Sequence, residues 1–165
     1  MKEVREYILS KWEQTFHEPK EMRGDYVVPK PYVSPSIGGM YTDLYYWDVY
    51  FTNLGLMLDG FDGQVENNLD NMAYFIDTLG YMPNANTLTD RSQPPLFCTA
   101  VYDYYVHKKD AAIIEKYMPY ILVRNQQRFA YKSQRFYYPD PPKSTYRTRQ
   151  PNRSSFSPVC HTFRP

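Results

Sequence analysis

Apolar residues recur every three or four positions in five stretches of the sequence, a spacing typical of amphipathic helices. In the second stretch, for example, Trp47, Phe51 and Leu54 follow one another at this interval. The pattern predicts helices at about residues 3–17, 42–59, 63–79, 96–107 and 111–131. No apolar and polar alternation long enough for a strand occurs before Gln134. We therefore expect an all-α fold of successive antiparallel helix pairs with long loops at one end.

The boundaries of these stretches carry residues that commonly start or end a helix. Gly60 and Gly80 each follow the last apolar position of a stretch, where glycine accommodates a left-handed C-terminal cap. The pair Pro94-Pro95 lies at a helix start, and Asp110 is placed to cap the next helix. Pro119 lies inside the last stretch and should bend or split that helix.

Two long segments do not follow the helical pattern. Residues 18–39 carry three closely spaced prolines and end in Gly-Gly, which predicts a long loop of the kind that often has a function. Residues 133–165 contain six basic residues, one acidic residue and six of the 14 prolines. We therefore divide the chain into a helical portion, residues 1–132, and a basic tail, residues 133–165. The tail is interpreted either as disordered or as translated from a shifted reading frame.

Composition narrows the classes of function. The formal charge is only +1, so the sequence lacks the excess of positive charge that binding to nucleic acid requires. The 18 tyrosines are compatible with a partly solvated sugar-binding groove, because each joins an apolar ring to a polar hydroxyl; they are equally compatible with a tyrosine-rich core. The two cysteines and three histidines have no metal-ligand spacing. We expect Cys98 to be buried in helix packing.

The sequence also bears on location. No stretch approaches the roughly 20 apolar residues that span a bilayer, so no membrane partner is expected. The first six residues are highly charged and lead into no apolar signal core. Together these features predict a cytoplasmic location.

The first of three polar clusters places Gly38-Gly39 ahead of Tyr41 and the pair Trp47-Asp48. A carboxylate at a helix start can accept two sugar hydroxyls, and an indole beside it can cover the apolar face of a pyranose. Taken alone, Trp47 is more commonly a core residue, and Asp48 more commonly an ordinary first-turn helix residue.

The second and third clusters lie on the loop between two helix pairs. Asn84 and Asn86 flank a residue in a proline-containing loop, and Arg91 and Gln93 precede a double proline. Their side chains offer amide and guanidinium donors to a ligand. Each cluster alone also fits turn chemistry or a capping loop. Only the combination of the three describes a site for a polyol.

In this order and at these spacings, the motifs resemble those of trehalases, glycoside hydrolase family 37, and of the related family 63. The resemblance spans about residues 29–116. It is carried by Gly38-Gly39, Tyr45-Tyr46-Trp47-Asp48, Tyr50-Phe51, Leu54-Gly55-Leu56, Val65-Glu66-Asn67-Asn68, Asn71, residues 80–86 and residues 91–95. The resemblance implies an (α/α)6 toroid of antiparallel helix pairs, present here only in part.

The resemblance also implies a reaction, the inverting hydrolysis of α,α-trehalose to glucose, with no metal or organic cofactor. The partner would be a small carbohydrate, trehalose or a related α-glycoside. Residues carried over to the glycone subsite are Tyr41, Trp47, Asp48, Asn84, Arg91 and Gln93. Tyr41 and Trp47 would form the aromatic wall, and the polar residues would hold the sugar hydroxyls.

Three departures from the family pattern qualify this expectation. Met40 stands where the family usually has arginine, and the connection from Asn86 to Arg91 is short. Both changes leave room for another α-glucoside or an α-mannoside. The family's catalytic acid and base lie in segments that this sequence does not contain, so we expect an N-terminal portion that is inactive alone. Exposed inner helix faces could then self-associate, and the alternative is a non-catalytic sugar-binding or helical interaction remnant.

Overall fold

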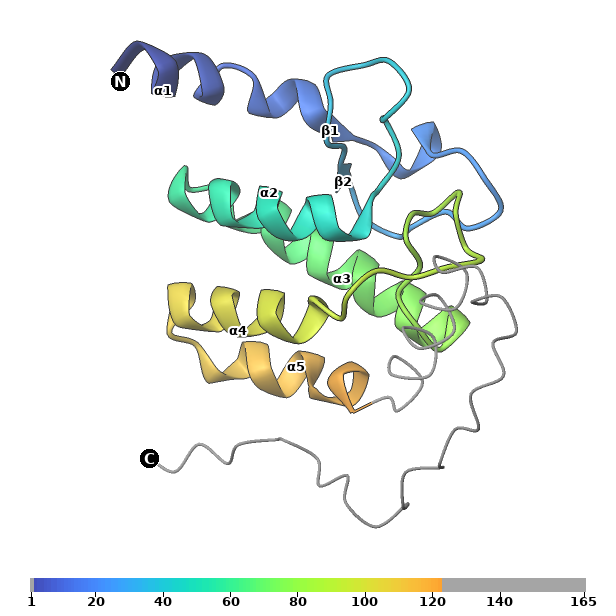
Figure 1. Ribbon diagram of the computed structural model, residues 1–165. Coiled ribbons are helices and arrows are strands. Elements are labelled where there is room, and N and C mark those ends of the chain that lie inside the picture. Colours follow the sequence, from blue (N-terminus) through green and yellow to red (C-terminus); the bar gives the residue numbers. More distant parts are fainter. Residues whose placement is uncertain (1, 123–165) are drawn as a thin grey trace, which may run out of the picture.

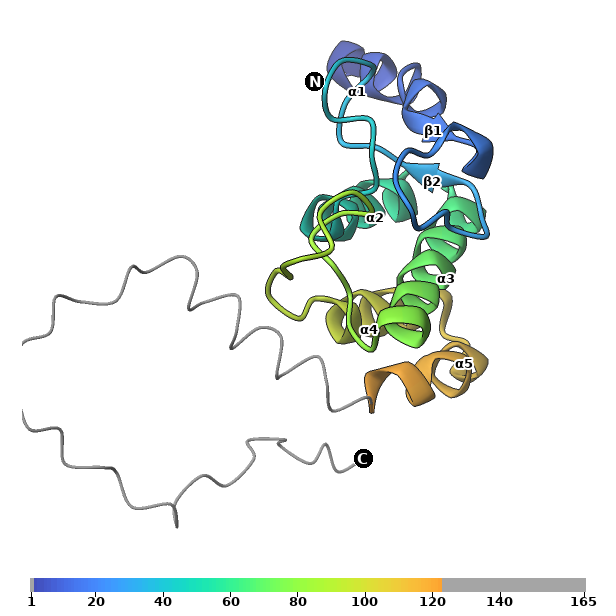
Figure 2. The same cartoon turned by 90° about the vertical axis from the view of Figure 1, so that its right-hand side faces the viewer.

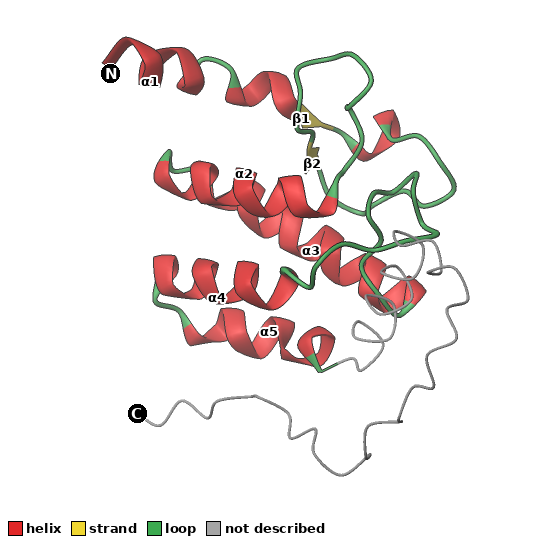
Figure 3. Ribbon diagram, viewed as in Figure 1, coloured by secondary structure: helices red, strands yellow, loops and turns green. Residues whose placement is uncertain are grey.

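The computed structural model describes residues 2–122, which are mainly helical (Figures 1 and 3). The four long helices are α2 (Tyr46–Leu58), α3 (Asp62–Leu79), α4 (Phe97–Lys108) and α5 (Ala111–Ile121). They are preceded by α1 (Lys2–Leu9), η1 (Trp12–Thr15), β1 (Phe16–His17), η2 (Pro19–Glu21) and β2 (Tyr32–Val33). The predicted all-α class is confirmed. The proposed tail and its boundary with the helical portion lie outside the described residues.

The long helices form two antiparallel pairs, α2 with α3 and α4 with α5, each joined by a short turn (Figure 1). The first helices of the two pairs run in the same direction and begin side by side, because the Phe97 amide donates a hydrogen bond to the Tyr46 hydroxyl at 2.8 Å. Seen from this end, α2 and α4 form one layer and α3 and α5 the other (Figure 2). Two hairpins stacked in this way form part of an (α/α)6 toroid, as expected.

The predicted helix boundaries at the turns are confirmed. Gly60 and Gly80 have φ angles of +82° and +77°, the left-handed conformation in which a side chain would be strained. Asp110 caps α5, since its Oδ1 accepts a hydrogen bond from the Ala112 amide at 3.0 Å. Gly60 and Asp110 thus lie at the two short turns, whereas Gly80 ends α3 at the opposite end, where the loops gather.

The core lies between the two pairs and under the loops. It is formed chiefly by Leu44, Val49, Leu56, Val65, Leu69, Met72, Phe75, Ile76, Phe97, Val101 and Tyr117. Burial of each large side chain contributes about 1.5–3 kcal/mol to the hydrophobic stabilisation. Within residues 2–122, no helix has both the length and the apolar character that crossing a bilayer requires.

The first predicted helix is shorter than the sequence pattern indicates, because α1 ends at Leu9. Trp12 then turns toward α2, where its indole N–H donates to the Asp59 carboxylate at 2.7 Å. The same ring packs on Gly55, where an added Cβ would lie 3.0 Å from it. A tertiary contact therefore overrides the continuing helical pattern. The expected burial of Cys98 is also wrong, since this side chain is exposed.

The proline-containing segment before the Gly-Gly loop is fixed to α3 by Asn71. Its Oδ1 accepts from the Lys30 amide at 3.1 Å, and its Nδ2 donates to the carbonyls of Lys30 and Pro31 at 3.1 and 3.2 Å. The buried Asn71 side chain thus supplies hydrogen-bond partners for backbone groups that have none within a helix or sheet. The segment therefore lies along α3, where the Pro31 carbonyl also accepts from Gln64 Nε2 at 3.1 Å.

A small ion cluster joins the opposite end of the pairs, where α3 begins and α4 ends. The Asp62 carboxylate accepts from Lys108 Nζ at 2.7 Å and lies 2.8 Å from His107 Nε2. The hydrogen bond from Lys108, assisted by that from His107, lowers the pKa of Asp62 below its usual 3.8. The cluster is partly exposed, so its contribution to stability is modest.

Candidate functional site

The loops before α2 and before α4 are joined by main-chain hydrogen bonds. The Tyr46 amide, at the start of α2, donates to the Asn84 carbonyl at 2.9 Å. The Asn86 amide donates to the Leu44 carbonyl at 3.3 Å. The first and second polar clusters are therefore neighbours in space, although about 40 residues separate them in the sequence.

The third cluster is attached to the second in the same way. The Asn84 amide donates to the Arg91 carbonyl at 2.8 Å, and the Ser92 hydroxyl donates to the Met82 carbonyl at 2.6 Å. The three clusters converge at the loop end, which faces the viewer in Figure 2. This convergence is what a shared ligand site requires.

A buried polar network that the sequence did not reveal supports this convergence. The Asn86 side chain accepts from the Leu44 amide at 2.9 Å and donates to the Arg23 carbonyl at 2.6 Å. The guanidinium of Arg23 donates to the buried Asp43 carboxylate at 3.1 Å, and Thr87 donates to the same oxygen at 3.2 Å. These bonds hold residues 43 and 44 outside the helix, which explains why α2 begins at residue 46 rather than near 42.

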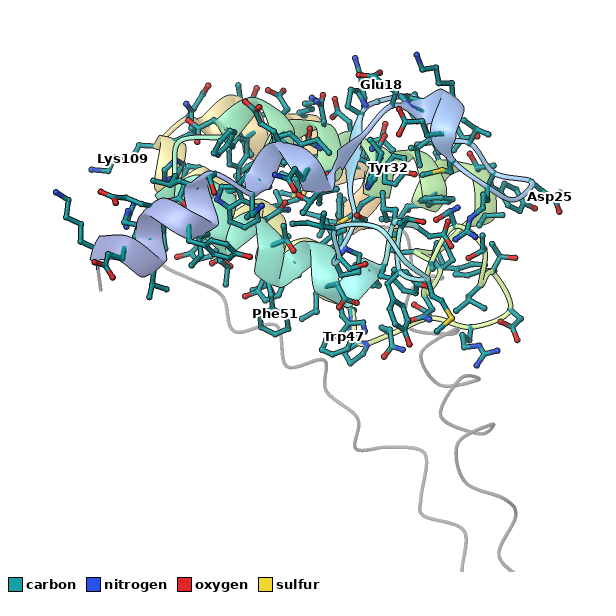
Figure 4. All side chains as sticks on the ribbon, turned by 90° about the horizontal axis from the view of Figure 1, so that it is seen from above. Glu18, Asp25, Tyr32, Trp47, Phe51 and Lys109 are labelled. Atoms are coloured by element: carbon teal, nitrogen blue, oxygen red, sulfur yellow. The ribbon has the colours of Figure 1, made fainter. Side chains whose placement is uncertain are left out.

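Trp47 and Asp48 lie in the first turn of α2. The Trp47 side chain is 47% exposed and meets Phe51 edge to face, with ring centroids 6.2 Å apart. Figure 4 shows both rings projecting from the same side of α2, away from the body of the molecule. Partial burial raises the pKa of the Asp48 carboxyl above its usual 3.8, because water is removed from around it. The indole thus offers an open face beside a carboxylate.

Tyr41 lies on the loop that follows the Gly-Gly pair. Its ring is exposed and contacts Tyr45 edge to face at 5.8 Å between centroids. Gly38 and Gly39 have φ angles of +73° and +79°, so the loop depends on glycine at both positions. The phenol ring is available to a ligand at the loop end.

Asn84 differs from the neighbouring amides because it is not fully used by the fold. The residue is 9% exposed, and its Oδ1 has no hydrogen-bond partner among residues 2–122. A buried polar atom without a partner costs about 1–3 kcal/mol, so such atoms often mark a site that receives a ligand or water. Asn84 is the best-defined polar group of the candidate site.

Arg91 and Gln93 occupy the rim. The Arg91 guanidinium is exposed and donates twice to the neighbouring Asp90 carboxylate, at 2.9 and 3.2 Å. This pairing lowers the pKa of Asp90 below 3.8. Gln93 lines a small hollow at the start of α4, together with Tyr46, Met82, Ser92 and Pro95. Both predicted residues lie at the loop end, but the guanidinium of Arg91 is engaged by its neighbour.

The site therefore combines exposed aromatic rings with amide, carboxylate and guanidinium groups, the surface that a sugar requires. Asp43 is held by Arg23 and Thr87, which leaves Asp48 as the carboxylate beside the indole. Within the described portion, no three His, Cys, Asp or Glu side chains cluster as metal ligands would.

Comparison with known proteins extends this picture. The family model described as Trehalase matches residues 2–153. The periplasmic trehalase of Pseudomonas aeruginosa is 43% identical over 106 residues, covering 63% of this chain and 18% of that protein. That of Xanthomonas campestris is 36% identical over 133 residues, covering 78% of this chain and 22% of the relative. That of Escherichia coli O6:H1 is 42% identical over 106 residues, with 63% and 18% covered.

The chain thus spans about a fifth of the length of the curated relatives it matches. Their names contradict the cytoplasmic location predicted from the sequence, because each is called periplasmic. The prediction rests on the lack of a bilayer-spanning stretch and on the charged first residues. In a chain that covers so little of its relatives, these residues do not report on export.

Proposed function

Because this chain belongs to the trehalase family, we propose that it forms part of the glucose-binding wall of a hydrolase acting on α,α-trehalose or a related small α-glycoside. The observation that carries the proposal is the convergence of the three clusters around Asn84. Its unpartnered Oδ1 lies on the loop whose backbone is bonded to the first turn of α2. That turn carries Trp47 and Asp48.

Each residue has a role that follows from its chemistry and placement. Trp47 and Tyr41 present exposed rings that cover the apolar face of a pyranose. Asp48 accepts sugar hydroxyls, and Asn84 supplies an acceptor that the fold leaves unused. Arg91 and Gln93 complete the rim. Arg91 gives up one of its two hydrogen bonds to Asp90 and donates to a sugar hydroxyl instead.

Hydrolysis needs more than this wall. An inverting glycosidase uses an acid and a base about 6.5–9.5 Å apart on opposite sides of the scissile bond. We propose that this chain supplies neither and releases no glucose alone. The enzyme's activity then depends on the parts of its relatives that the chain does not cover. From the names of those relatives, we also propose that the protein acts in the periplasm.

Isothermal titration calorimetry of the folded chain with trehalose and with glucose tests the proposal. We expect binding that Asp48→Asn weakens by about 10-fold or more, since a hydrogen bond to a charged group contributes about 1.5–3 kcal/mol. Glu115→Gln, the same change on the exposed surface of α5, should leave binding unchanged.

Three results would contradict parts of this proposal. A folded chain that binds neither sugar refutes the binding wall. Equal affinity for wild type and Asp48→Asn removes Asp48 from the site. Glucose release by the chain alone, followed by an enzyme-coupled assay, refutes the claim that the acid and base lie elsewhere.

A further inference from the structure

A line of hydrogen bonds runs from β1 to the Gly-Gly loop. His17 Nε2 lies 2.8 Å from Ser34 Oγ, and the Ser34 hydroxyl donates to the Ser36 carbonyl at 2.7 Å. The Ser36 hydroxyl in turn lies 2.9 Å from the Gly38 carbonyl and 3.0 Å from the Tyr41 carbonyl. We call His17, Ser34 and Ser36 the relay.

The proton positions in the relay follow from donor counting. The Ser34 hydroxyl has one proton and lies 2.7 Å from the Ser36 carbonyl and 3.5 Å from the Thr15 carbonyl; both carbonyls can only accept, so we assign the Ser34 oxygen as the acceptor toward His17. Nε2 of His17 therefore carries a proton. The other ring nitrogen lies 3.3 Å from Glu21 Oε2, and the Tyr32 ring lies against the imidazole at 5.2 Å between centroids. Figure 4 marks the position of this tyrosine, Tyr32, beneath the segment that begins at Glu18.

The order serine, histidine, glutamate is also that of a nucleophilic triad, but the geometry does not support catalysis. Ser34 is only 2% exposed, so no substrate carbonyl can reach its oxygen. Its proton points to Ser36 rather than to the imidazole, whereas a nucleophilic serine must give its proton to histidine. The relay is therefore suited to holding backbone in place.

The loop at the end of the relay has little other support. Ile37, Met40 and Tyr41 are all at least half exposed. A Cβ added at Gly38 or Gly39 would meet no atom within 4 Å, so no packing surrounds either glycine. Within residues 2–122, the side-chain hydrogen bonds to residues 38–41 come from Ser36. The conformation of the loop thus depends on the Ser36 hydroxyl, and Ser34 holds the backbone of that residue through its carbonyl.

We propose that His17 and Ser34 are positioning residues for the loop of residues 38–41, and hence for the Tyr41 ring at the sugar site. The effect of His17 and Ser34 on sugar binding rests on the proposed function, whereas their effect on the conformation of residues 38–41 is independent of it. His17 acts through the Nε2 proton, so a side chain that places an N–H at the same point should replace it.

Nuclear magnetic resonance of the 165-residue chain tests the proposal directly. In the wild type, the ring nitrogen shifts of His17 should show a protonated Nε2; an unprotonated Nε2 in the folded chain would overturn the relay without any variant. Backbone ¹⁵N relaxation at Gly38 and Gly39 should give order parameters near 0.8, against about 0.85 for rigid backbone.

The variants separate positioning from general stability. In Ser34→Ala and His17→Leu, the order parameters of Gly38 and Gly39 should fall below about 0.6, while those of α3 stay unchanged. His17→Gln, whose amide can place an N–H near the Nε2 position, should restore the wild-type values. Glu21→Gln, which alters the opposite side of the ring, serves as the control and should have no effect on the loop.

Unchanged loop order in both Ser34→Ala and His17→Leu, or failure of His17→Gln to restore it, overturns the proposal. Trehalose titrations then separate this idea from the proposed function. A loosened loop with weaker binding supports both. A loosened loop with unchanged affinity refutes the positioning of Tyr41 for the sugar. A loosened loop in a chain that never binds sugar leaves the relay standing and refutes the proposed function.

Discussion

Asn86 is the residue on which the loop end most depends, because its amide joins segments that are distant in the sequence. The side chain is 1% exposed, accepts from the Leu44 amide at 2.9 Å and donates to the Arg23 carbonyl at 2.6 Å. Asn86→Ala removes both hydrogen bonds. Asn86→Asp keeps the acceptor for Leu44 and removes the donor for Arg23.

The magnitude follows from which groups water can reach. Leu44 is fully buried, so its amide stays unpaired in Asn86→Ala, at a cost of about 1–3 kcal/mol. Arg23 is exposed, so water can partly replace the lost donor, and this loss adds about 0.5–1.5 kcal/mol. The expected destabilisation is about 2–4 kcal/mol, a large part of the roughly 5–15 kcal/mol that keeps a protein folded.

The aspartate variant adds a pH dependence that the alanine variant lacks. Its introduced carboxylate would be buried against the Arg23 carbonyl oxygen, which raises its pKa in the folded state above the unfolded value of about 3.9. Such a group is compatible with folding below the unfolded pKa and destabilises as pH rises. The deficit should therefore be large at pH 7 and much smaller at pH 4.

Urea unfolding followed by circular dichroism measures these differences. With a slope of about 1–3 kcal/mol/M, the midpoint of Asn86→Ala should fall by about 1–2 M. Asn67→Ala and Asn67→Asp, on the partly exposed surface of α3, are matched controls. A loss below about 0.5 kcal/mol, within the usual effect of surface substitutions, would refute the reasoning. So would an aspartate deficit that does not change between the two pH values.

Three further predictions concern the helices. Gly55→Ala should lower the melting temperature although alanine favours a helix by about 1 kcal/mol, because its Cβ would press on the Trp12 ring and overpacking costs about 1–3 kcal/mol; a higher melting temperature would show that the ring yields. Tyr46→Phe should cost about 1–3 kcal/mol in urea unfolding by leaving the buried Phe97 amide unpaired, and an unchanged midpoint would contradict this. Asp62→Asn should cost up to about 1 kcal/mol at pH 7. Because the folded-state pKa of Asp62 is lowered, its stabilisation is present above pH 3.8 and is lost as pH falls below that value, so the stabilities of wild type and variant should converge in acid; a constant difference would exclude this cause.

The helix pairs could be predicted from the sequence because their signals are local. Gly60, Gly80 and Asp110 act within one turn of the helices they bound, so propensity and capping rules apply directly. The first helix was predicted too long because Trp12 is drawn out of the pattern by Asp59 and Gly55, which lie more than 40 residues away. Hydrophobic periodicity is detected over short stretches of sequence, and none of these stretches includes both partners of that contact.

The site could be predicted only in part. Resemblance to trehalases singled out the six candidate residues, and their roles toward a sugar stay predictions. The structure adds the buried support of Arg23, Asp43 and Asn86, which single-sequence reasoning missed because its hydrogen bonds join residues 20–63 positions apart. The position of Asn86 in a polar loop predicts a turn residue, but nothing in the sequence distinguishes a solvated turn amide from a buried one.

The long-range bonds at the loop end also bear on how the chain folds. Each helical hairpin closes through a turn of two or three residues, whereas the bonds from Leu44 to Asn86 and from Tyr46 to Phe97 span 42 and 51 positions. Contacts distant in sequence form late, because loop-closure entropy must be lost before they stabilise anything. The hairpins are therefore expected to assemble first and the loop end last. Mutations there should accelerate unfolding more than they slow folding, so the proposed sugar-binding surface is the part of the chain whose lifetime a bound ligand would prolong most.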